Sequence, residues 1–268
     1  MKIPFHLLAV TTVTVLLLTT RPASAHIGYG GRDFGTNPVS LTISNQTVSS
    51  AFGWADATDT DWGDSHRGRF FRFTLTNTVS VSITVERNSL GTGTNGVFLP
   101  AFSLYLGLGH LAPEQGSHDS AALSTNSRPI GTEGSLRALT DWSVGNDPTY
   151  VVSGDPGSGI LYPASLRHFT YIGHAADGTP ANYGDAPGIN GDGNADGYVT
   201  YLFENLAAGD YSLFVGGANY ASQEIETGPT YPTYGISTTV SVVPEPSTWA
   251  LVLTGVAATT LLRRCPRK

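Results

Sequence analysis

A short polar loop carries the strongest indication of a binding site in this sequence. Asp192, Asn194 and Asp196 stand at alternate positions, and Gly197 follows them. This spacing lets a tight loop turn three side-chain oxygens toward one hard cation, and the carbonyl of Tyr198 would add a ligand. The pattern predicts a calcium site with a structural rather than a catalytic role. The alternative is an ordinary Gly/Asn/Asp turn without an ion.

The same loop resembles the first half of an EF-hand or dockerin-type calcium loop, and it departs from that pattern at its end. Counting from Asp192, position 12 is Phe203, where a bidentate glutamate belongs. Glu204 comes one place late. Asp185 and Asp210 are candidate substitutes from nearby loops.

A second group of carboxylates lies around Trp54 and Trp62. Its members are Asp56, Asp59, Asp61 and Asp64. The group could form another cation site, or a sugar platform in which the tryptophan rings stack on sugar faces. The alternative is a solvated loop whose tryptophans pack under the edge of the fold.

The first 25 residues have the features of a secretory signal peptide. Lys2 supplies a positive charge, an apolar run follows from Leu7 to Leu18, and Ala23 and Ala25 form a small-x-small cleavage site. We therefore expect an exported protein that starts at His26.

A chain that starts at His26 would carry a free amine and an imidazole on one residue, which together chelate copper. A complete copper site needs a second histidine. The candidates are His66, His110, His118, His168 and His174. A secreted enzyme that depends on copper or on a pair of carboxylates is therefore one alternative, although no catalytic motif supports it and we expect no enzyme.

The C-terminal residues 244–268 have three parts. Pro244, Glu245 and Pro246 come first, and the prolines keep the chain extended. Residues 249–262 form an uncharged segment, shorter than the roughly 20 apolar residues of a comfortable membrane span. A basic end follows, which favours a short transmembrane helix with this end in the cytoplasm; its charged residues are Arg263, Arg264, Arg267 and Lys268.

These three parts, in this order, resemble the PEP-CTERM sorting signal of Gram-negative bacteria. The resemblance covers about the last 25 residues. It implies transient anchoring in the inner membrane, recognition and removal of the tail by exosortase, and delivery to the cell surface or extracellular matrix, often together with exopolysaccharide. The alternative is an ordinary, uncut C-terminal anchor.

The charge of residues 26–243 excludes several classes of partner. This segment has 20 acidic residues, 8 arginines and no lysine, a formal charge of −12. Such a chain repels phosphate, so nucleic-acid binding is excluded, and it suits cations or a hydrated extracellular setting. The single cysteine, Cys265, lies in the tail, so a domain of residues 26–243 must fold without disulfides.

Alternating apolar residues predict an all-β domain, a β-sandwich or jelly roll. The expected strands are 71–75, 79–85, 102–106, 198–203, 211–215 and 236–242. We expect Asn77-Thr78 to form a tight hairpin turn, and residues 204–210 to form another hairpin-like connection.

The order of these strands, with Leu206-Ala-Ala-Gly209-Asp-Tyr211 and Val215-Gly-Gly, resembles bacterial pre-peptidase C-terminal domains, which are β-sandwich accessory modules. Residues 107–197 depart from that family. We interpret them as a loop-rich insertion with strands at 149–152 and 168–172, and as a candidate functional surface.

Together these observations predict a cell-surface or matrix protein with a structural or adhesive role, stabilised by calcium. The first alternative is a carbohydrate-binding module for exopolysaccharide. It would use Trp54, Trp62, Trp142 or tyrosines of the insertion. Aromatic rings aligned on one exposed face would favour this module, and burial of all three tryptophans would exclude it.

Overall fold

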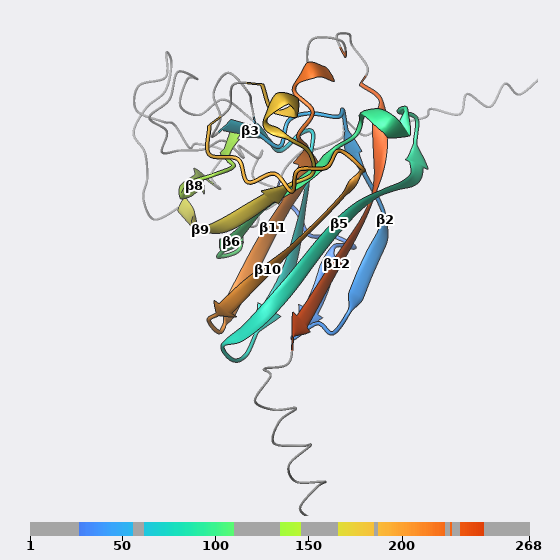
Figure 1. Cartoon of the computed structure of the whole chain (residues 1–268). Coiled ribbons are helices and arrows are strands. Elements are labelled where there is room, and N and C mark those ends of the chain that lie inside the picture. Colours follow the sequence, from blue (N-terminus) through green and yellow to red (C-terminus); the bar gives the residue numbers. More distant parts are fainter. Residues whose placement is uncertain are drawn as a thin grey trace, which may run out of the picture.

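The computed structural model describes residues 27–55, 62–109, 135–145, 166–184, 187–222, 226 and 231–243. Within these ranges the chain is built from β-strands and two short 3-10 helices, as the alternating pattern predicts (Figure 1). The strands are β1 (Asp33–Thr36), β2 (Leu41–Ser49), β3 (Trp62–Asp64), β4 (Arg69–Leu75), β5 (Val79–Gly91), β6 (Pro100–Leu106), β7 (Ser135–Arg137), β8 (Trp142–Gly145), β9 (Leu166–Ala176), β10 (Tyr198–Leu206), β11 (Gly209–Gly217) and β12 (Thr233–Val243). The 3-10 helices are η1 (Asn95–Val97) and η4 (Pro180–Asn182).

Two sheets face each other in a sandwich-like arrangement. The six-stranded sheet has the order β1-β4-β11-β6-β9-β8, and the four-stranded sheet has the order β10-β5-β12-β2. A separate two-stranded sheet pairs β3 with β7. The two predicted strands at 168–172 and 198–203 are present as parts of β9 and β10, whereas residues 149–152 lie outside the described residues.

Both predicted hairpins are wrong. β4 and β5 are consecutive in the chain, but β4 belongs to the six-stranded sheet and β5 to the four-stranded sheet. The same holds for β11 and β10. Alternation shows which residues of a strand face inward, but it does not show which of two facing sheets contains the strand. Each connection therefore crosses between the layers.

An inter-sheet core fills the space between the two sheets. It contains Phe71, Phe73 and Leu75 from β4 and every second residue of β5, namely Val81, Ile83 and Val85. From the remaining strands it contains, among others, Leu104, Phe203, Leu213 and Val240. This packing explains the period-two pattern of the sequence, because each of these strands places alternate residues in one core.

The opposite face of the six-stranded sheet is covered by a second cluster, which we call the outer aromatic cluster. Its large side chains are Ile27, Tyr29, Trp54, Trp62, Phe70, Tyr105, Leu136, Trp142, Phe169, Tyr183 and Phe214. The six-stranded sheet is therefore buried on both faces along much of β4, β6 and β11.

Residues 107–197 are more than a loop-rich insertion. β9 pairs with β6 through six residue pairs in antiparallel register, from Ala101 opposite Ala176 to Leu106 opposite Thr170. Phe169 of β9 and Trp142 of β8 stack in the outer aromatic cluster with ring centroids 4.5 Å apart and planes 6° apart. The described part of this segment thus supplies sheet and core.

Candidate functional sites

The predicted calcium loop lies beside the end of β9. The backbone N–H of Asp192 donates to the carbonyl of Ala176 at 3.0 Å, and that of Gly193 donates to the carbonyl of Gly178 at 3.1 Å. Gly197 has a φ of +84°, and a Cβ there would lie 2.4 Å from Cδ of Arg87. Glycine is therefore required at this turn, as the sequence pattern predicts.

The side chains of the loop bond to backbone N–H groups. Oδ1 of Asp192 accepts from Asn194 at 3.0 Å, and Oδ1 of Asp196 accepts from Tyr198 at 3.1 Å. These are local turns of the kind that Asp and Asn form without an ion. Among the residues that the structure describes, no three His, Cys, Asp or Glu side chains gather as a metal site would require.

Asp177 belongs to the same loop system, and the sequence pattern did not identify it. It is fully buried, and its two carboxylate oxygens accept from the N–H groups of Asp196 at 3.1 Å and Gly197 at 2.6 Å. Burial, together with the charges of Asp192 and Asp196, raises its pKa to about 6, although the two backbone hydrogen bonds act in the opposite direction. Asp177 is thus a desolvated carboxylate that feels the charges of Asp192 and Asp196, although the three side chains do not converge on one point.

The second acidic run is only partly described, because Asp56, Asp59 and Asp61 lie outside the described residues. Asp64 accepts from the backbone N–H of His66 at 2.9 Å and from Nε of Arg67 at 3.1 Å. Its carboxylate thus closes a turn after β3 and neutralises Arg67, as in the structural interpretation of this run.

The carbohydrate-binding module that the sequence predicts at Trp54, Trp62 and Trp142 is wrong, because all three rings are buried. Trp54 and Trp62 are 0% exposed and Trp142 is 1% exposed. Their rings form the outer aromatic cluster, and the indole N–H of Trp54 donates to Ser103 at 2.9 Å within that cluster. A sugar therefore has no access to these three rings.

His174 is a buried, neutral histidine. Its Nε2 accepts from the backbone N–H of Asn190 at 2.8 Å, so the ring proton lies on Nδ1, which bonds to the hydroxyl of Tyr171. Burial lowers its pKa to about 4. Both ring nitrogens are engaged, which argues against His174 as a metal ligand.

The other histidines divide into described and undescribed residues. Nδ1 of His66 lies 3.4 Å from Asp64, and Nε2 of His168 lies 3.9 Å from Asp141. His26, His110 and His118 lie outside the described residues. The structure therefore leaves the predicted copper site at His26 untested.

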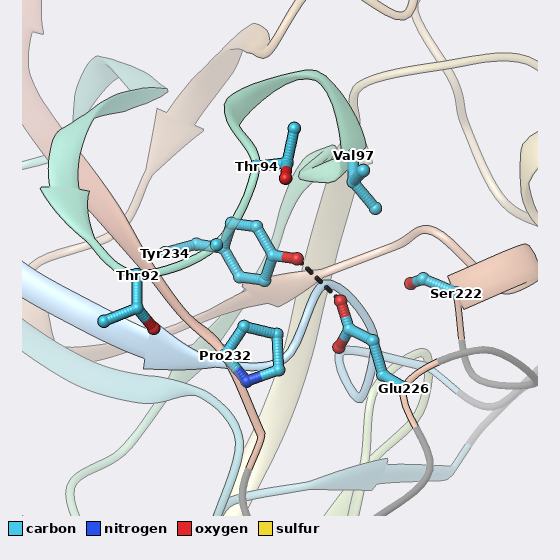
Figure 2. Close-up of a pocket in the computed structure, with 8 residues that line it drawn as sticks. Thr92, Thr94, Val97, Ser222, Glu226, Pro232 and Tyr234 are labelled. Carbon is cyan, nitrogen blue, oxygen red and sulfur yellow. Dashed lines mark hydrogen bonds between the residues drawn. The ribbon is translucent and has the colours of Figure 1, made fainter.

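A pocket of about 280 Å³ opens between the turn after β5 and the start of β12 (Figure 2). Its lining residues are Thr92, Gly93, Thr94, Val97, Ser222, Glu226, Pro232 and Tyr234. In Figure 2 the carboxylate of Glu226 points toward the phenol of Tyr234, which donates to it at 2.6 Å. The other oxygen of Glu226 accepts from the N–H of Ala51 at 3.1 Å.

The chemistry of this pocket is mainly structural. Burial and the adjacent Glu226 raise the pKa of Tyr234, so the phenol keeps its proton. The Tyr234 ring stacks on Phe98 with centroids 5.2 Å apart. The usual route of glycoside hydrolysis needs two facing carboxylates, whereas the described lining supplies one, and this one is already held by two donors.

The predicted processing residues lie outside the described residues. This applies to the cleavage positions Ala23, Ala25 and His26, to Pro244, Glu245 and Pro246, and to the basic residues Arg263, Arg264, Arg267 and Lys268. No helix within the described part of the chain has the length and apolar character needed to cross a bilayer.

No protein-family model matches this chain, and no curated protein sequence does. Among solved structures, it is similar to CorA, a surface-associated copper-binding protein important in Methylomicrobium album BG8 copper acquisition, at 17% identity and a TM-score of 0.47, over 78% of this chain and 98% of CorA. It is also similar to MopE, a secreted protein of Methylococcus capsulatus in which an oxidised tryptophan facilitates copper binding. That match has 17% identity and a TM-score of 0.40, over 79% of this chain and 87% of the MopE chain. Likeness at this level assigns neither a site nor a function to this chain.

Proposed function

We propose that this chain is an exported protein of the cell surface or extracellular matrix, with a structural or adhesive role and no catalytic activity of its own. The observation that carries the proposal is that the large aromatic side chains are buried in two separate cores, which cover both faces of the six-stranded sheet. The result is a rigid scaffold that folds without disulfides and presents the outer face of the four-stranded sheet.

The route to the surface is the one that the two ends of the sequence predict. The signal peptide directs export, and the segment from Pro244 to Lys268 anchors the chain in the inner membrane until an exosortase-type enzyme removes it. CorA and MopE, described as surface-associated and secreted, have a corresponding location.

Protease treatment of intact cells tests the location. A protein on the outer surface is digested before lysis, whereas a cytoplasmic marker in the same cells stays intact. Protection of this chain until the cells are lysed would contradict the proposal.

We also propose that calcium stabilises the loop at Asp192, Asn194, Asp196 and Tyr198. The support is Asp177, whose ionised form is disfavoured first by burial and then by the charges of Asp192 and Asp196. A divalent cation next to these carboxylates would relieve that repulsion.

Copper binding is the second candidate function, and one contact favours it. The N–H of Gly109 donates to the hydroxyl of Tyr29 at 3.1 Å, and a Cβ on Gly109 would lie 3.3 Å from Cδ1 of the buried Ile27. In the sequence His26 directly precedes Ile27, and His110 directly follows Gly109. Two described segments that touch thus each continue into a histidine.

Titration of the exported form with Cu(II), followed by electron paramagnetic resonance, tests this candidate. Coordination by the terminal amine and imidazoles predicts a nitrogen-ligated signal that is lost when one alanine is added before His26 and is altered by His110→Ala. An unchanged signal in both variants would contradict a copper site at His26. His66→Ala is the matched control, because His66 lies beside Asp64 instead.

A further inference from the structure

A row of four threonines crosses the outer face of the four-stranded sheet. Thr239 of β12 lies opposite Thr42 of β2 on one side and opposite Thr84 of β5 on the other. Thr84 in turn lies opposite Thr200 of β10. Because the neighbouring residue Ile83 is fully buried in the inter-sheet core, the threonines of this row point away from that core.

A second row of hydroxyls runs beside the first. Ser241 lies opposite Ser82 of β5, and its Oγ is 3.2 Å from Oγ of Ser40, just before β2. Leu202 of β10 lies opposite Ser82 and ends the row. Figure 1 shows β10, β5, β12 and β2 in the foreground, with no other labelled strand in front of them.

The hydroxyls of the threonine row are only partly used within the protein. Thr84 and Thr200 are 2.9 Å apart, and Thr42 and Thr239 are 2.7 Å apart. Each hydroxyl has one donor and two acceptor lone pairs, so every member keeps bonding capacity toward solvent. Neighbouring strands are about 4.8 Å apart, and alternate residues along a strand are about 6.8 Å apart. The face is therefore a grid of hydroxyls.

The third row on this face contains the exposed Glu86 and Tyr198 and the buried Ser237, whose hydroxyl accepts from Nδ2 of Asn88 at 3.0 Å. Glu86 is the single charged side chain of the three rows, although the domain around them has a formal charge of −12. Tyr198, on the edge strand β10, is 42% exposed. An exposed aromatic ring thus stands beside one carboxylate and a field of neutral hydroxyls.

We propose that this face binds a neutral polysaccharide. The hydroxyl rows would exchange hydrogen bonds with sugar hydroxyls, and the Tyr198 ring would stack on the apolar face of one sugar. This inference rests on the proposed surface location, because only there would the chain meet an extracellular polysaccharide.

Three properties favour this ligand over others. The acidic domain repels a polyanion, and the three rows offer one carboxylate to a polycation. The face lacks the buried apolar centre of a stable protein–protein interface. A four-stranded sheet also twists by roughly 20° per strand. A flexible polysaccharide can follow this twist, whereas the flat surface of an ice crystal, another possible ligand for rows of hydroxyls, cannot.

Native gel electrophoresis of the exported form, in gels that contain a β-glucan or a galactomannan, tests the proposal. We expect at least one of these neutral gels to retard the chain, and a gel containing anionic alginate to leave it unretarded. Thr84→Val plus Thr239→Val keeps the β-branched shape, removes two hydroxyls and should weaken binding about tenfold. Tyr198→Ala should weaken it as well.

Thr36→Val plus Thr74→Val is the matched control, because these threonines are also paired across neighbouring strands, β1 and β4, but belong to the other sheet. It should bind like the unaltered chain, and thermal melting should show that all variants are folded. The proposal would be overturned if no neutral gel retards the chain, or if alginate alone does. Equal retardation of the Thr84→Val plus Thr239→Val variant would also overturn it, as would inhibition of ice growth without any retardation. Loss of surface digestion in the protease experiment would instead overturn the proposed location, which keeps the two failures distinct.

Discussion

Asp177 combines burial, hydrogen bonds to two backbone N–H groups and two nearby negative charges. The folded chain raises its pKa from 3.8 to about 6. The folded state therefore binds this proton more tightly than the unfolded state does.

The first prediction follows from that difference. The stabilisation that comes from protonated Asp177 is fully present below about pH 3.8 and is lost as the pH rises through about 6. Lowering the pH from 7 to 5 should therefore raise the free energy of unfolding of the unaltered chain relative to Asp177→Asn, as measured by urea denaturation. Comparison with the variant cancels the opposite effect of His174, whose pKa is lowered to about 4. Parallel pH curves for the two proteins would contradict this assignment.

The second prediction concerns calcium at the same loop. Added calcium should raise the melting temperature at pH 7, chelation should lower it, and the rise should be smaller at pH 5, where Asp177 is protonated. The response should disappear in Asp192→Ala plus Asp196→Ala. Glu204→Ala, which removes a carboxylate from the far part of β10, should retain it. A melting temperature that ignores both calcium and chelator would exclude an ion here.

At the residue scale, local spacing predicted part of the site. The positive φ of Gly197 follows from the Asp-rich turn in the sequence. Asp177 did not, because it is 15 residues before Asp192 and meets the loop through the bridge between Ala176 and Gly191. Glu226 likewise meets Tyr234 and Ala51 through the tertiary fold, which no local pattern encodes.

At the scale of elements, the outer aromatic cluster distinguishes this sandwich from one with a single core. Trp142 stacks on Phe169 at 4.5 Å and meets Tyr105 edge-on, with ring centroids 6.2 Å apart. These contacts join β8 and β9 to β6, so the cluster fixes the part of the six-stranded sheet that the sequence suggested was an insertion.

The third prediction tests the weight of this cluster. Trp142→Ala removes a fully buried ring and should lower the free energy of unfolding by about 3–5 kcal/mol. Leu90→Ala, at a position that is 45% exposed, should change it by less than about 0.5 kcal/mol. Urea denaturation with a common slope measures both. A small effect of Trp142→Ala would show that the cluster contributes little to stability.

The strands themselves were largely predictable, and their partners were not. Residues 79–85 alternate strictly because one face of β5 enters the inter-sheet core, and this pattern identifies the strand from the sequence. β2 was missed because its residues are mostly exposed or half-buried along its length, with Val48 alone fully inside. The turns after β4 and β10 have the local sequence of hairpins. They nevertheless connect strands of different sheets, which only the three-dimensional structure shows.

At the scale of the whole molecule, the acidic charge and the absence of lysine from residues 26–243 suit a hydrated extracellular setting rather than a polyanionic partner. The sandwich closes its six-stranded sheet on both sides and leaves the hydroxyl face of the other sheet open. This division of the molecule is consistent with the proposed role as a passive surface component.

The most direct test of this account is the intact mass, together with the terminal peptides, of the protein recovered from the native cell surface and medium. The account predicts a chain that starts at His26 and ends near Pro244, with any additional mass at the new C-terminus identifying an attached group. A chain that retains the tail through Lys268 and stays in the membrane would contradict the proposed sorting and, with it, the proposed surface function.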